Sequence, residues 1–153
     1  MSNQVFQTGN TFDAQTINAG HARKVWRRIE EQLPGGFMIK NISDFVTAGL
    51  IRSGLPIVKD STQGADEKDV KVLTWSQVKT AISGSGIDTL GIIGFLQEDV
   101  PVKDAYTVAT ANVIVKGEIY GYMLGDTAGD AATIAAAVKG MTQKNGLNIR
   151  VVD

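Results

Sequence analysis

The sequence predicts a β-rich α+β fold: a small antiparallel β-sandwich or barrel-like domain with a short N-terminal helix and an alanine-rich C-terminal helix. Short apolar runs broken by glycine or proline fill residues 36–124, and such runs are typical of strands joined by sharp turns. An alanine-rich stretch with helical spacing follows, and a strand-like alternation comes after it. We therefore expect one β-rich domain over residues 22–153, preceded by an extended arm over residues 1–21.

The bulk composition supports one ordinary core and excludes several classes of protein. The 153 residues are 43% hydrophobic, and single domains commonly have about 100 to 200 residues. The net charge of −1 argues against a nucleic-acid-binding protein that relies on a large positive surface. The chain has no cysteine, which excludes disulfides and thiolate metal sites.

No membrane association is expected from the hydropathy pattern. No apolar run approaches the roughly 20 residues that a membrane-spanning helix needs. Residues 1–20 also lack the basic start and apolar block of a secretory signal, so we expect no export by that route.

Residues 2–20 have the composition of an arm, because they are rich in Asn, Gln and Thr and show no sustained period. Two interpretations stay open. The segment is either a frayed terminus or an arm that orders on a partner, with an added strand and the apolar side chains of Val5, Phe6 and Phe12 as anchors.

The next segment predicts a short amphipathic helix over residues 22–33. Val25, Trp26, Ile29 and Leu33 recur at helical spacing, and Pro34 with two glycines ends the pattern. The opposite face is either a binding surface for an acidic partner or a solvated face neutralised by its own glutamates. Its charged residues are Arg23, Lys24, Arg27, Arg28, Glu30 and Glu31.

Short extended pieces are expected over residues 36–60, with Pro56 at a strand start or a sheet edge. Residues 61–69 are polar and predict a surface loop. A helix of one or two turns should begin near Thr74, whose hydroxyl can cap it, and should end at residues 83–86.

The stretch from Leu90 to Leu124 is the expected centre of the domain, with short strands, sharp turns and a strand that ends near a glycine. After it, Asp130 is expected to cap a helix that runs from Ala131 to about Gln143. Residues 147–152 then alternate in the manner of a closing strand.

The candidates for catalysis or metal binding are weak. His21 is the only histidine, so a His-based triad or metal cluster has no second imidazole. The acidic pairs Glu98 with Asp99 and Asp126 with Asp130 lack the pattern of a calcium loop, and turns or helix caps explain them. The glycines of residues 84–91 lack the Lys-Ser/Thr ending of a phosphate loop. We expect no enzyme, no cofactor and no metal site.

Three segments, taken in order, carry a family resemblance: Ile51-Arg-Ser-Gly-Leu-Pro-Ile-Val58, Gly94-Phe-Leu-Gln-Glu-Asp-Val100 and Val113-Ile-Val-Lys-Gly-Glu-Ile119. The series resembles phage capsid decoration and head-fibre proteins. The resemblance covers roughly residues 36–124. The part after Gly125 has no counterpart in it, and the helix of residues 22–33 extends the usual entry of the family.

The resemblance implies a β-rich virion structural protein on the outer surface of a tailed-phage head, made in the host cytoplasm. Its partners would be the major capsid protein and further copies of itself, commonly as a homotrimer, with no direct contact to nucleic acid. The arm would contact the capsid through Val5, Phe6 and Phe12, and Ile114, Ile119 and Tyr120 are the expected oligomer contacts.

Two other function classes are kept beside this one. In the first, the chain is a carbohydrate-binding fibre module whose Tyr120 and Tyr122 stack on sugar rings. The second, a small hydrolase that uses Asp99 or His21, has the weakest support.

Overall fold

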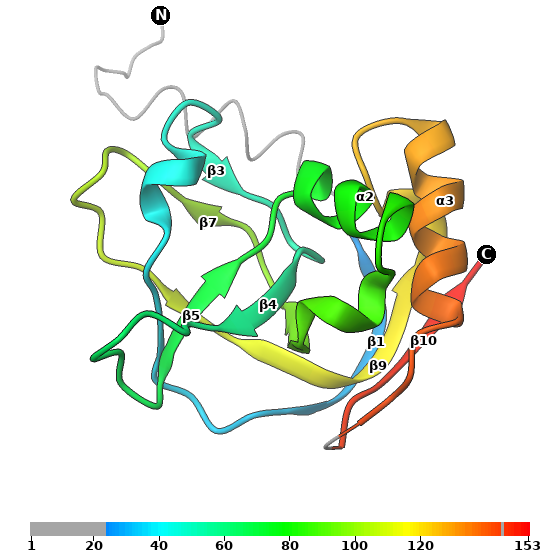
Figure 1. Cartoon of the computed structure of the whole chain (residues 1–153), viewed down its shortest axis with the longest axis horizontal. Coiled ribbons are helices and arrows are strands. Elements are labelled where there is room, and N and C mark those ends of the chain that lie inside the picture. The colour runs from blue at the N-terminus through cyan, green and yellow to red at the C-terminus, as the bar shows by residue number, and fades with distance from the viewer. Residues whose placement is uncertain (1–23, 145) are drawn as a thin grey trace, which may run out of the picture.

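The computed structural model describes residues 24–144 and 146–153, which form a β-rich body with two helices (Figure 1). The predicted arm, including Val5, Phe6 and Phe12, lies outside the described residues, as does His21.

Eight strands form one curled sheet that resembles half of a barrel (Figure 1). Their order is β1-β9-β6-β4-β5-β2-β8, and β10 also pairs with β9. The strands are β1 (Trp26–Gln32), β2 (Phe37–Ile39), β4 (Pro56–Lys59), β5 (Asp69–Val72), β6 (Ile92–Leu96), β8 (Thr110–Ala111), β9 (Val113–Tyr120) and β10 (Asn148–Val152). A separate pair joins β3 (Leu50–Ile51) to β7 (Val100–Pro101).

The barrel-like, β-rich prediction fits this architecture, but the expectation of a purely antiparallel sheet is wrong. β10 runs parallel to β9, and β2 runs parallel to β5. The closing strand predicted for residues 147–152 is present as β10, and a helix lies between it and β9. A helical crossover allows the returning strand to run parallel to the first, which a tight hairpin does not.

The helix predicted for residues 22–33 is wrong for the described part of that segment, because Trp26–Gln32 form the strand β1. Its pairing with β9 shifts register at three places, so that the side chains do not alternate regularly between two faces. The irregular spacing of Trp26 and Ile29 therefore imitates a helical period. Trp26 is held in the sheet by tertiary contacts, since its indole N–H donates to the Leu96 carbonyl at 3.1 Å.

Two helices cover the sheet, and both are capped by threonine. α2 (Trp75–Ser83) begins after Thr74 as predicted, and its capping box pairs Thr74 with Gln77. α3 (Ala128–Lys139) begins earlier than predicted, because Thr127 and not Asp130 accepts the capping hydrogen bond. Asp130 instead lies in the first turn of α3, where its carboxylate pairs with Lys79 of α2 at 3.2 Å. Short 3-10 turns occupy η1 (Ile42–Phe45), η2 (Ile87–Leu90) and η3 (Gly121–Met123).

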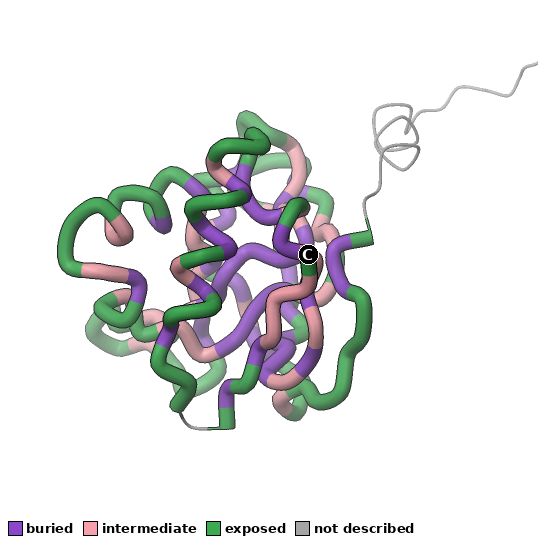
Figure 2. Tube along the Cα trace, turned by 90° about the vertical axis from the view of Figure 1, so that its right-hand side faces the viewer, coloured by how far each residue is buried: buried purple, intermediate pink, exposed green. Residues whose placement is uncertain are grey.

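β9 pairs with three other strands and has partners along both of its edges. β1 follows one edge, while β6 pairs with the first residues of the other edge and β10 with the remainder. One apolar core extends from β1 to β10, and Figure 2 shows its buried trace inside an exposed shell. The largest side chains buried without exposed surface include Phe95, Ile51, Ile57, Leu96, Ile114 and Ile119.

Two glycines permit this close packing around β9. A Cβ at Gly117 would lie 2.5 Å from the carbonyl oxygen of Arg28 in β1. A Cβ at Gly94 of β6 would lie 2.8 Å from the carbonyl oxygen of Ile114 in β9. Both distances are too short for real atoms, so each position requires a residue without a side chain unless the backbone moves.

Replacing Gly117 by alanine should therefore destabilise the fold by about 1 to 3 kcal/mol, the usual cost of overpacking a close-packed region. The measurement is the free energy of unfolding in urea. Gly35→Ala is the matched control, because a Cβ at Gly35 meets no atom within 4 Å. Equal stability of the Gly117→Ala variant and the control would contradict the close approach of β1 and β9.

Candidate functional site

The segments that carry the family resemblance lie next to one another in the folded chain. β4, from the first segment, pairs with β6 from the second, and β6 pairs with β9 from the third. The short strands β3 and β7 join the outer ends of the first two segments. Sequence stretches separated by up to about a third of the chain thus form one continuous structural unit.

Asp99 is the polar centre of this unit. Its carboxylate accepts a hydrogen bond from the backbone N–H of Ser53 at 2.6 Å and lies 3.9 Å from the guanidinium of Arg52. The hydroxyl of buried Ser53 donates to the carbonyl of Gln97 at 2.7 Å. These contacts tie the turn after β3 to the turn after β6, so the geometry gives Asp99 a structural role.

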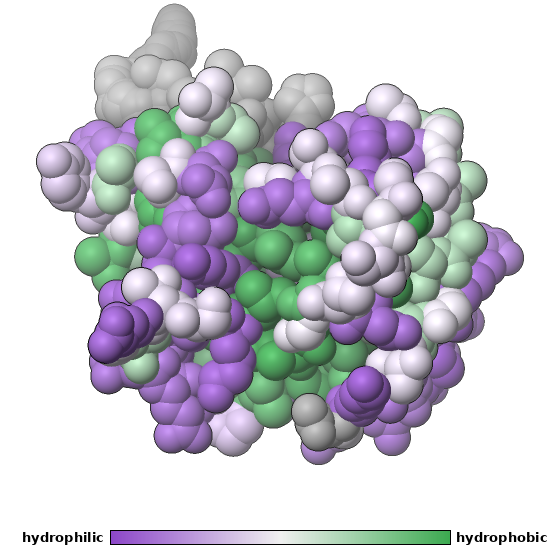
Figure 3. Space-filling view, viewed as in Figure 1, coloured by the Kyte–Doolittle hydropathy of each residue, from purple (hydrophilic) through white to green (hydrophobic). Residues whose placement is uncertain are grey.

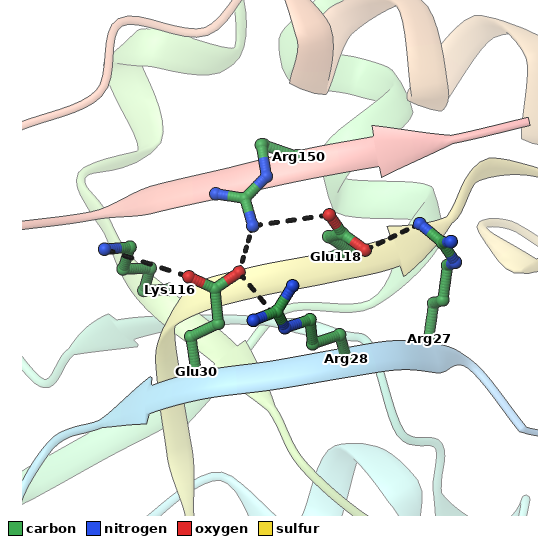
Figure 4. Close-up of polar contacts among 6 residues, drawn as sticks. All are labelled: Arg27, Arg28, Glu30, Lys116, Glu118 and Arg150. Carbon is green, nitrogen blue, oxygen red and sulfur yellow. Dashed lines mark hydrogen bonds and ion pairs between the residues drawn. The ribbon is translucent and has the colours of Figure 1, made fainter.

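A second feature is a charged face on β1, β9 and β10 (Figure 4). Glu30 contacts Arg28, Lys116 and Arg150, while Glu118 contacts Arg27 and Arg150. Four cations thus surround two carboxylates, and each of the three strands contributes to the cluster. The basic residues of β1 that were candidates for an acidic partner are paired with glutamates, one of them, Glu30, on β1 itself.

The hydrogen bond from Arg150 lowers the pKa of Glu30 below its ordinary value, and the charges of Arg150, Arg28 and Lys116 act in the same direction. The same pairing raises the pKa of Arg150, which keeps its positive charge. The cluster therefore links β1 to β10 across β9 as long as Glu30 is ionised.

The third feature is an apolar hollow at the open side of the curled sheet, with a volume of about 400 Å³. Figure 3 shows this apolar area between two polar walls. Its floor includes side chains from β2, β6 and β9, from the residue that follows β1 and from the connection between α3 and β10. Among them are Leu33, Phe37, Ile93, Val115, Met141 and Leu147.

Charged side chains form the rim of the apolar hollow. Lys68 lies 4.3 Å from the centre of the Phe37 ring and donates to the Pro34 carbonyl, and Asp88 accepts hydrogen bonds from Thr142. Within residues 24–144 and 146–153, Lys59, Glu67 and Lys144 make no ion pair. The rim thus offers charges of both signs to an incoming group.

Sequence reasoning missed an exposed turn over residues 103–108, here called the Tyr106 turn. Its tip presents Tyr106, which is 91% exposed, and Val108, which is 79% exposed. Hydrogen bonds hold the backbone: Lys103 N and Asp104 N donate to the Thr107 hydroxyl at 3.1 Å, and Tyr106 N donates to the Asp104 carboxylate at 2.9 Å. In Figure 1 the turn lies in the loop that follows β7. The sequence signal was an aromatic and a β-branched residue in a polar segment.

A pair of tyrosines lies at the end of β9, beside α3. The rings of Tyr120 and Tyr122 are 5.5 Å apart and tilted by 45°, and Tyr122 is 65% exposed. A shallow cleft next to Tyr122 is lined by alanines of α3 and by Asp153, and it has a volume of about 290 Å³.

The predicted oligomer contacts do not share one environment. Ile114 and Ile119 have no exposed surface within one chain, so they belong to the core of the protomer and cannot touch a second copy. This corrects the role expected for them, and the reason is that β9 is covered on both edges and over its apolar face. Tyr120 is partly exposed and remains available for contact.

Over the described residues, no group of three or more His, Asp or Glu side chains could hold a metal ion. In that part of the chain, no helix is both long and apolar enough to span a membrane.

The charged face predicts a pH dependence of stability. Because folding lowers the pKa of Glu30, its ion pairs contribute stability above the ordinary carboxyl pKa, and this contribution is lost as the pH falls through the lowered value. The free energy of unfolding of Glu30→Gln should therefore differ from wild type at neutral pH, and the difference should shrink as the pH is lowered below the ordinary carboxyl pKa and through the lowered value.

The control for this experiment is Glu31→Gln on the same strand, since Glu31 is exposed and has no salt bridge within the described part of the chain. Urea unfolding at several pH values measures both variants. A difference between wild type and Glu30→Gln that stays constant from neutral to acidic pH would rule out the coupling.

Comparison with known proteins did not extend these observations: no protein-family model, no curated protein and no solved structure matches the chain.

Proposed function

We propose that this chain is a structural protein of a tailed-phage virion that binds the outer capsid surface, as a decoration protein or at the base of a head fibre. The observation that carries the proposal is the assembly of its three resemblance segments into one unit through β3–β7 and β4–β6–β9. A similarity of short motifs has more weight when the motifs form one contiguous part of the fold.

The attachment point of the arm suits a capsid-binding role. Residues 1–21 precede β1, whose first residues are firmly held: the Val25 carbonyl accepts a hydrogen bond from Tyr120 N at 2.9 Å, and Trp26 packs edge-on against Phe95. Force on the arm would thus pass directly into β9, the partner strand of β1. In this proposal Val5, Phe6 and Phe12 anchor the arm on the major capsid protein, and the chain performs no chemistry.

The proposal predicts that deletion of residues 2–20 abolishes binding to capsids of the encoding phage that were prepared without this protein. The residues from Lys24 onward contain the core, so the thermal unfolding temperature should stay the same. Co-sedimentation with the capsids measures binding. Unchanged occupancy after the deletion would refute the role of the arm.

Point variants sharpen this experiment. Exchange of Val5, Phe6 and Phe12 for serine in the full chain should also abolish binding, because it removes the apolar anchors and keeps the length of the arm. The matched control exchanges the polar residues Gln4, Gln7 and Asn10 for serine and should keep the occupancy of the wild type.

One observation favours a second function, the binding of a carbohydrate by a fibre module. Tyr122 is exposed and lies beside Tyr120, which together offer an aromatic surface for a sugar ring next to the cleft on α3. Asp153 at the same cleft supplies a carboxylate that can accept hydrogen bonds from sugar hydroxyls.

If this second function holds, a glycan array should give signals that Tyr122→Ala removes. Tyr106→Ala is the control, because Tyr106 is an exposed tyrosine in another part of the molecule. An array without signals for the wild-type chain would reject carbohydrate binding and leave the capsid proposal standing.

A further inference from the structure

Two surfaces of the folded chain are apolar and accessible at the same time. One is the Tyr106 turn, which projects an aromatic and an aliphatic side chain into solvent. The other is the apolar hollow at the open side of the sheet. Tyr106 is almost fully exposed, so the turn of a chain does not fill the hollow of the same chain.

We propose that the Tyr106 turn of one copy docks into the apolar hollow of a second copy. The turn is a protrusion and the hollow is a recess. The two exposed side chains at the tip of the turn, Tyr106 and Val108, are small enough to enter a recess with a volume of about 400 Å³. Tyrosine is enriched among the residues that dominate protein interfaces, because it buries a large rigid surface and keeps a polar end.

Each of the two surfaces carries charges of both signs that can pair with the other. The turn carries Lys103 and Asp104. One carboxylate oxygen of Asp104 accepts a hydrogen bond from Tyr106 N, and the other makes no hydrogen bond or ion pair within the described part of the chain. The rim of the hollow carries Lys59, Lys144 and Glu67, which form no ion pair within residues 24–144 and 146–153. Opposite charges across an interface favour correct docking and fix its register.

The turn is also preorganised for binding. Asp104 and Thr107 close it through four hydrogen bonds that involve the backbone of residues 103–107. A loop that is already ordered loses little conformational entropy when it binds, which leaves more of the contact energy for affinity.

A second copy of the chain would cover both the Tyr106 turn and the apolar hollow, whereas any other occupant would cover only one of them. A small aliphatic anion would fill the hollow and pair with Lys59 or Lys144, but Tyr106 and Val108 would stay exposed. The arm of residues 1–21 would likewise cover the hollow alone. Contact between different patches of identical chains is heterologous, and it closes into a ring when the rotation between neighbours allows it.

Complementation between two variants tests this contact in the full chain. Tyr106→Ser removes the aromatic side chain of the Tyr106 turn and leaves the hollow intact. Ile93→Gln makes the hollow polar and leaves the turn intact. Light scattering should give an oligomer for the wild type and the monomer mass of 16.3 kDa for each variant alone. The mixture should give pairs of one chain of each variant, because it contains one intact turn and one intact hollow for each pair.

Three results would overturn the proposal: a monomeric wild type, an unchanged mass for Tyr106→Ser, or a mixture that stays monomeric although both variants unfold at the wild-type temperature. Tyr122→Ser is the matched control and should keep the wild-type mass, because Tyr122 is an exposed tyrosine outside both surfaces. The proposal does not depend on capsid binding, since every measurement uses the isolated chain.

A covalent probe makes the test independent of the folding of the Ile93→Gln variant. The chain has no cysteine, so Ala105→Cys, at an exposed position of the turn that leaves Tyr106 in place, and Lys144→Cys introduce one thiol each. Under mild oxidation a mixture of these two variants should give a disulfide-linked pair in much higher yield than a mixture of Tyr122→Cys with Lys144→Cys. Equal yields for the two mixtures would exclude the docking of the turn at the rim.

Discussion

The pairing of β9 along both of its edges is the constraint on which the rest of the structure depends. β1, β6 and β10 all hydrogen-bond to this strand, so the first and the last strands of the described chain lie on opposite edges of β9. Gly117 makes this possible, because any side chain at that position would collide with the backbone of β1. The position of β9 also explains why Ile114 and Ile119 belong to the core and are unavailable to a partner.

The surfaces of the molecule follow from this arrangement. β1 and β10 flank β9, which brings glutamates and basic residues from three distant segments into one charged face. The sheet curls and does not close into a full barrel, so its apolar side is left accessible at the hollow between η2, β6 and the connection to β10. The proposed capsid contact and the proposed contact between copies use different parts of the chain, and both can therefore operate in one virion.

Local signals predicted some elements well. Thr74 caps α2 because its hydroxyl and the side chain of Gln77 satisfy backbone groups within three residues, and no distant contact is needed. Alanine content likewise predicted α3, although Thr127 displaced Asp130 as its cap. The strand β1 was mistaken for a helix because its bulges destroy the alternation of side chains, and its conformation is set by hydrogen bonds to β9, about 90 residues away in the sequence.

The sequence by itself determined a cysteine-free, β-rich chain with a helix capped by Thr74 and an alanine-rich helix, and it supplied the ordered motifs on which the functional proposal is based. Only the tertiary structure decided that the sheet is mixed, that Asp99 serves as a structural acceptor for Ser53, and that Tyr106 projects into solvent while Ile119 is buried. The physical reason is that caps and propensities act within a few residues, whereas strand direction, burial and ion pairing depend on which distant segments meet.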